Sequence, residues 1–119
     1  MQPFDLVIRG GTIATATDTM KADLGIRGQT IAAIGQDLDK GVKEIDARGK
    51  LVLPGGVDSH SHIEQLSASG LMNADTFQSA TTAAAYGGTT TVISFAAQHV
   101  GMSLKTVVDE YHQYAERGE

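Results

Sequence analysis

Two histidines placed two residues apart carry the clearest chemistry in this sequence. His60 and His62 follow a Pro-Gly-Gly breaker at residues 54–56, and Asp58 lies two residues before the first histidine. Side chains two apart on a strand share a face, so a strand over 57–62 would present all three on one side. Neutral imidazole is the commonest protein ligand for zinc-like metals. The spacing therefore predicts that His60 and His62 bind one metal ion from a rigid strand.

The residues between the histidines support this interpretation. A His-x-His pair alone is weak evidence, because such a pair can also be an ordinary part of a strand. Here Ser59 and Ser61 alternate with the histidines, so the stretch carries polar groups on both faces. A strand that served only a core would not have this pattern.

The composition limits the classes of protein to consider. The chain has 119 residues, of which 41% are hydrophobic and 19% charged, with a net charge of −5, as in ordinary globular domains. The acidic balance argues against nucleic acid or an anionic membrane as a partner. Cysteine is absent, so any metal must be held by nitrogen and oxygen ligands.

The sequence also bears on location. The N-terminus lacks the basic head and apolar run of a signal peptide. No stretch approaches the about 18 apolar residues of a membrane-spanning helix. We therefore expect a cytoplasmic protein that does not interact with membranes.

Residues 1–53 have the short runs and tight turns of a β domain. Strands are predicted over 4–9, 12–15, 22–27, 30–35, 42–47 and 50–53. Gly10-Gly11 and Gly28-Gln29 are predicted to be hairpin turns. The pattern indicates half of a small antiparallel β-sandwich.

Residues 54–119 have a different rhythm. A strand over 57–62 and a loop over 63–74 are followed by a helix, a buried strand over 89–95 and a second helix. The expected helix boundaries are Asp75 as N-cap with Gln78, Gly87-Gly88 as the stop, Ser103 as the second N-cap and Gly118 as the second stop. This order begins an α/β fold of parallel strands, as in the first two βα units of a barrel. A closed barrel needs about 250 residues, so we expect the chain to be the N-terminal part of a longer protein.

Several motifs resemble one family of enzymes. The segment 51–62, Leu-Val-Leu-Pro-Gly-Gly-Val-Asp-Ser-His-Ser-His, resembles the metal-binding opening of the amidohydrolase superfamily. Residues 5–13, 74–77 and 87–96 are similar to the hydantoinase and dihydropyrimidinase branch. The resemblance covers essentially the whole chain and implies a TIM-like (β/α) barrel preceded by the small sandwich.

The resemblance also implies an activity. Members of this branch hydrolyse an amide bond of a cyclic ureide, such as a hydantoin or a dihydropyrimidine, to an N-carbamoyl amino acid. They use two divalent metal ions, usually zinc, at the C-terminal mouth of the barrel. A carboxylated lysine, two further histidines and an aspartate from later strands complete the site, and relatives are commonly homotetramers.

Only some positions of this chain match that site. His60 and His62 correspond to the metal ligands of the first barrel strand. Asp58 matches the acidic residue before them, where it orients an imidazole or the backbone, or else has a structural turn role. No catalytic residue and no credible bridging lysine lie within the 119 residues, so the isolated chain is expected to be inactive.

The loop after the first barrel strand shapes the substrate pocket in such enzymes. The resemblance therefore makes four residues candidates for contact with the ring substituent, with loop packing as the alternative: Gln65, Leu66, Leu71 and Met72. His99 follows the second barrel strand, where it is either a substrate contact or an ordinary polar loop residue.

Two other functions remain open. Allantoinases and dihydroorotases share the histidine motif and are the nearest alternative among enzymes. A non-catalytic scaffold related to dihydropyrimidinase is the alternative outside enzymes. Such scaffolds typically lose metal-binding histidines, whereas His60 and His62 are both present here.

Overall fold

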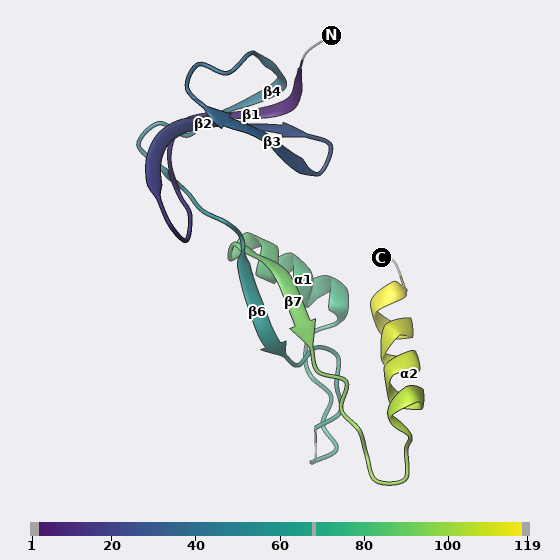
Figure 1. Ribbon diagram of the computed structural model, residues 1–119. Coiled ribbons are helices and arrows are strands. Elements are labelled where there is room, and N and C mark those ends of the chain that lie inside the picture. Colours follow the sequence, from purple (N-terminus) through teal and green to yellow (C-terminus); the bar gives the residue numbers. More distant parts are fainter. Residues whose placement is uncertain (1–2, 68, 118–119) are drawn as a thin grey trace. The chain divides into compact units, whose positions relative to one another are not determined.

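The computed structural model describes residues 3–67 and 69–117, which form two compact units (Figure 1). We call Met1–Pro54 the β unit and Gly55–Glu119 the α/β unit. Over the described ranges, no helix is long and apolar enough to cross a membrane.

The β unit is one mixed sheet. Its strands are β1 (Phe4–Ala14), β2 (Thr19–Arg27), β3 (Thr30–Gly35), β4 (Gly41–Asp46) and β5 (Leu51–Val52). The order is β3-β2-β1-β4, with β5 also paired to β1. β2 runs antiparallel to β1 and β3, but β4 and β5 run parallel to β1. The prediction of a wholly antiparallel sheet is therefore wrong. After β3 the chain crosses to the far side of β1, where β4 joins the sheet parallel to β1.

The first glycine pair is not a turn. β1 continues through Gly10 and Gly11 to Ala14, with a register shift against β2 between Ile8 and Gly11. Gly10 has φ +64°, a conformation that glycine adopts without steric cost, so the predicted turn is instead a β-bulge. The hairpin closes later, where Thr15 N donates to Asp18 O at 2.8 Å. The predicted turn at Gly28 is confirmed, with φ +58°.

The β unit has its own small core. Its buried centre consists of Ile13, Ala22 and Leu24, against which Ile8, Ile26 and Val52 pack. Val7 is fully buried. Beside this core Asp23 is buried and accepts hydrogen bonds from Gly10 N at 2.8 Å and from Arg9 at 2.9 Å. These bonds satisfy a carboxylate that would otherwise be costly to bury.

The α/β unit has the predicted order strand, helix, strand, helix. Its elements are β6 (Gly56–Ser61), α1 (Phe77–Tyr86), β7 (Thr89–Ser94) and α2 (Leu104–Glu116). β6 and β7 are parallel, and α1 forms the crossover between them (Figure 1). The carboxyl ends of both strands therefore lie at one edge, where sites of parallel α/β folds are built. β7 is not the buried strand that was predicted, since Ile93 is 57% exposed.

The helix starts were predicted with mixed success. α1 has Thr76 as N-cap rather than Asp75, because Thr76 and Ser79 make the reciprocal capping-box bonds that were expected of Asp75 and Gln78. Ser103 caps α2 as predicted. The predicted stop at Gly118 lies outside the described residues, and α2 ends at Glu116.

Candidate metal-binding site

The histidine motif lies at the carboxyl end of β6. The strand ends at Ser61, so His62 is the first residue beyond it, and a register shift between Asp58 and Ser61 breaks the predicted strict alternation. Asp58 Oδ1 accepts a hydrogen bond from His60 N at 3.0 Å. This bond joins Asp58 to the backbone of the motif two residues on, which fits both the orienting role and the structural turn role left open for Asp58.

The two imidazoles nevertheless converge. His60 Nε2 and His62 Nε2 lie 3.0 Å apart, and the ring planes are tilted by 55° with centroids 4.9 Å apart. Two ligand nitrogens that each bind a zinc-like ion at about 2.0–2.1 Å are about 3 Å apart when they subtend close to a right angle at the metal. Both rings are exposed. The pair is therefore spaced to share one ion and open to its entry.

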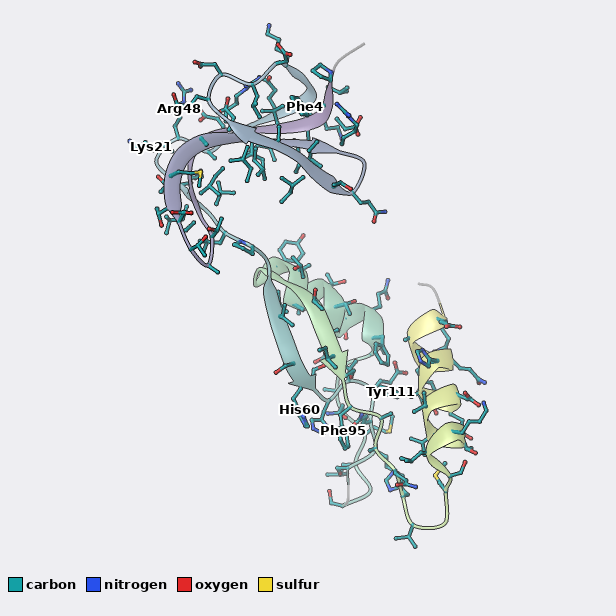
Figure 2. All side chains as sticks on the ribbon, viewed as in Figure 1. Phe4, Lys21, Arg48, His60, Phe95 and Tyr111 are labelled. Carbon is teal, nitrogen blue, oxygen red and sulfur yellow. The ribbon has the colours of Figure 1, made fainter. Side chains whose placement is uncertain are left out.

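An aromatic ring supports the pair. Phe95 is the first residue after β7, and Figure 2 shows it beside His60 at the strand ends. Its centroid is 5.3 Å from that of His60, nearly parallel at 28°, and 5.2 Å from that of His62. Phe95 N also donates to Ser61 O at 2.8 Å. The sequence analysis missed this residue, although parallel pairing of the strands places the residue after β7 near the end of β6.

The loop after the motif supplies a hydrogen bond to one imidazole. His62 Nδ1 lies 2.9 Å from Gln65 Oε1, and Gln65 is only 8% exposed. Asn73 holds this segment from the other side of the loop. Its Oδ1 accepts from Gln65 N and its N donates to Gln65 O, both at 2.9 Å.

Helix α2 anchors the backbone that follows the motif. Tyr111 points toward the strand ends in Figure 2, and its hydroxyl donates to Ile63 O and lies 2.7 Å from Ser94 Oγ. Ser94 Oγ is also 3.3 Å from Ser61 O. One hydroxyl thus links α2 to the ends of both strands. The sequence analysis did not identify this role of Tyr111.

Glu64 turns the chain directly after the motif. Its φ of +49° is rare for a residue with a side chain, and such strain persists only where surroundings hold it. The carboxylate pairs with Arg117 and accepts from Phe77 N at 3.1 Å. The hydrogen bond from Arg117, assisted by that from Phe77 N, lowers the pKa of Glu64.

The remaining predicted pocket residues do not all meet. Leu66 and Met72 form an antiparallel bridge across the loop and, with His99, line an open cavity of about 160 Å³. Leu71 is 70% exposed and is not among the residues that line this cavity.

The donor set fits part of a metal site. Histidine nitrogens at this spacing suit a zinc-like ion, but a protein site normally supplies three ligands or more. Over residues 3–67 and 69–117, no group of three or more His, Asp or Glu residues could hold a metal. Lys105 pairs with Asp109 on the surface of α2. Within the described residues, His60 and His62 therefore fit a zinc-like ion as two of its ligands.

Comparison with known proteins places the chain in a family. Residues 43–113 match the model of the amidohydrolase family. The chain is 46% identical over 110 residues to the D-hydantoinase of Geobacillus stearothermophilus, which is 92% of this chain and 23% of that relative. It is 37% identical over 117 residues to the dihydropyrimidinase of Rattus norvegicus, covering 93% and 22%. An allantoinase of Rubrobacter xylanophilus is 45% identical over 91 residues, covering 76% and 19%.

Structural comparison agrees with the sequence relatives. A solved D-hydantoinase structure superposes with a TM-score of 0.88 at 45% identity, covering 94% of this chain and 24% of the other. This chain therefore belongs to the amidohydrolase family, in its hydantoinase and dihydropyrimidinase branch. It spans about a quarter of the length of the relatives it matches.

Proposed function

We propose that the protein to which this chain belongs is a metal-dependent cyclic amidase. It opens the ring of a hydantoin or a dihydropyrimidine at a C–N amide bond and releases an N-carbamoyl amino acid. Within this chain, His60 and His62 are the metal ligands, and the other ligands lie beyond these 119 residues in a completed barrel.

One observation carries the proposal. The Nε2 atoms of His60 and His62 lie 3.0 Å apart at the carboxyl end of β6, in a chain that matches D-hydantoinases over 92% of its length. A divalent metal held there would polarise the amide carbonyl and activate water, which compensates for the poor electrophilicity of an amide.

The other residues of the chain have supporting roles in this proposal. Phe95 and Gln65 hold the two imidazoles in place, and Asp58 holds the backbone of His60. Leu66 and Met72 line the cavity described above, where the ring substituent would bind, and Leu71 precedes Met72 in the sequence as a further candidate contact. Gln65 lines the same cavity as Leu66 and Met72, so it is also a candidate contact.

The test uses the complete protein that carries this chain. We expect the purified protein to contain a divalent metal by elemental analysis, and to hydrolyse phenylhydantoin or dihydrouracil. His60→Ala and His62→Ala should each reduce activity by more than the about 10–100-fold typical of an outer-sphere partner, with the fold retained by circular dichroism.

His112→Ala is the matched control, because His112 is an exposed histidine on α2. It should leave the activity unchanged. A protein that purifies without metal and cannot be reconstituted with zinc, manganese, iron or nickel would contradict the proposal.

A second cyclic amide substrate is favoured by one comparison. The match to an allantoinase at 45% identity makes allantoin the alternative substrate. Parallel assays with allantoin and dihydroorotate distinguish the candidates, since the substrate with the highest kcat/KM identifies the reaction.

A further inference from the structure

We infer that Gln65 is a positioning residue whose side-chain carbonyl holds His62 in the tautomer with a free lone pair on Nε2. This inference rests on the proposed metal site, because it assigns Gln65 a task toward that site. It gives Gln65 a role that is separate from contact with substrate.

The hydrogen bond to Gln65 decides which nitrogen of His62 carries the proton. Gln65 Oε1 lies 2.9 Å from His62 Nδ1, and a carbonyl oxygen can only accept. His62 must therefore donate from Nδ1–H. In a neutral imidazole that leaves Nε2 as the acceptor, which is the form that binds a metal.

The loop holds Gln65 in position for this task. Glu64, with φ +49°, turns the chain so that Gln65 faces back toward His62 three residues earlier. Two hydrogen bonds to Asn73 fix the backbone of Gln65, and Leu66 pairs with Met72 directly beyond it. Gln65 is a residue only 8% exposed on a tied backbone, so its side chain has little freedom to turn away.

The same geometry makes the two histidines unequal. The contact between His60 Nε2 and His62 Nε2 at 3.0 Å needs one proton between the nitrogens. If His62 presents a lone pair there, His60 must donate from Nε2–H. Metal binding then requires His60 to move its proton to Nδ1, whereas His62 is already in the tautomer whose Nε2 can bind a metal.

The NH2 group of Gln65 allows its positioning role to be tested apart from its effect on stability. Gln65 Nε2 is buried, and within the described part of the chain no hydrogen-bond partner reaches it. Burying a half-satisfied polar group is unfavourable, so an apolar side chain here removes the unpaired NH2 group, and because His62 is exposed, water can take over the hydrogen bond of its Nδ1–H. A residue retained only for folding would not be an amide here. Gln65→Leu should therefore keep the fold but remove the hydrogen bond to His62 Nδ1.

The first measurement needs no variant. In the metal-free complete protein, 15N-histidine labelling and long-range 1H–15N correlation can assign the tautomers of His60 and His62. We expect His62 protonated on Nδ1 and His60 on Nε2. His62 protonated on Nε2 would overturn the inference, because the amide would then be donating through its NH2 group.

The second measurement is zinc affinity of the complete protein, by competition with a chromogenic chelator. We expect Gln65→Leu to weaken binding by about 10–100-fold, as outer-sphere partners of metal-ligating histidines do, without lowering the melting temperature. Gln65→Glu retains an acceptor and should restore affinity to within about threefold. Gln113→Leu, at an exposed glutamine of α2, is the control and should match the unmodified protein.

The two proposals fail in different ways. If the unmodified protein binds no divalent metal, the proposed function fails, while the tautomer of His62 still tests Gln65. If the unmodified protein binds zinc and Gln65→Leu binds it equally tightly, the inference about Gln65 fails and the metal site stands.

Discussion

The β unit buries more residues than the α/β unit, seven against three over the described ranges when glycines are left aside. In the β unit, aliphatic side chains such as Ile13 and Leu24 pack on one face of a five-stranded sheet. In the α/β unit no residue of α1 is buried, and the buried residues of the described part are Ile63, Gln65 and Val107. Two of these three lie within three residues of the end of the histidine motif.

This difference shows where order comes from in each unit. The β unit is held by a core of its own. The α/β unit concentrates hydrogen bonds at the strand ends, where Tyr111, Gln65 and Glu64 each tie down backbone or side chains next to the histidines. We conclude that the site region is organised by polar contacts more than by apolar burial.

Truncation of a core side chain should give the largest difference in unfolding free energy between the two units. Leu24→Ala removes a buried side chain of the β unit and should cost about 2–5 kcal/mol of unfolding free energy. Leu71→Ala, at a leucine of the α/β unit that is 70% exposed, should change it by less than about 0.5 kcal/mol. Chemical denaturation of both variants measures this, and equal losses would break the contrast between the units.

Removal of one hydroxyl should have the next largest effect. Tyr111→Phe leaves Ile63 O without its donor in a partly buried place and should cost about 1–3 kcal/mol. It should also weaken zinc binding, since the backbone beside His62 is released. Tyr86→Phe, at a tyrosine that is 92% exposed, is the control. If Tyr111→Phe and Tyr86→Phe unfold at the same denaturant concentration, Tyr111 does not anchor the strand ends.

The next effect in size is the contribution of Glu64 to stability in acid. Its pKa lies below the ordinary 4.5 because of the Arg117 hydrogen bond, so the folded state binds this proton less readily than the unfolded state. The stabilising contribution is therefore complete above about pH 4.5 and is lost as the pH falls through the lowered pKa. We expect Glu64→Gln to be less stable at neutral pH and to lose less stability below pH 4.5.

The measurement for Glu64 is the slope of unfolding free energy against pH. The variant should take up as much as one proton fewer on unfolding in acid. Asp23→Asn gives the counterpart in the β unit. Burial opposes a lowered pKa at Asp23, but the bonds from Gly10 N, Arg9 and Leu38 N outweigh it and lower the pKa. An unchanged acid slope in Glu64→Gln would rule out its pairing with Arg117 in solution.

A surface ion pair should have the smallest effect. Lys105 and Asp109 pair one helical turn apart on α2, with Lys105 83% exposed. Lys105→Ala should cost about 0.2–0.5 kcal/mol at low salt, and less at high salt. A loss above about 1 kcal/mol would mean that α2 depends on exposed charges, contrary to its anchoring through Tyr111.

Local patterns predicted the elements better than their pairing. Alternation and turn residues located most strands of the β unit, and Ser103 was found as a helix cap. The parallel pairing of β4 with β1 was missed, because strand direction depends on a crossover that leaves no local pattern. The bulge at Gly10 was mistaken for a turn, since a glycine pair is compatible with both.

For the site, the sequence alone predicted that His60 and His62 lie together, because residues two apart in one short segment stay within reach of each other even where the strand is irregular. Only the tertiary structure decided what holds that pair. Phe95 reaches it through the pairing of β6 with β7, and Tyr111 reaches Ile63 across 48 residues of chain. Even Gln65, three residues from His62, contacts it only because the loop closes through Asn73. Such contacts depend on the path of the whole chain, which no short window of residue types contains.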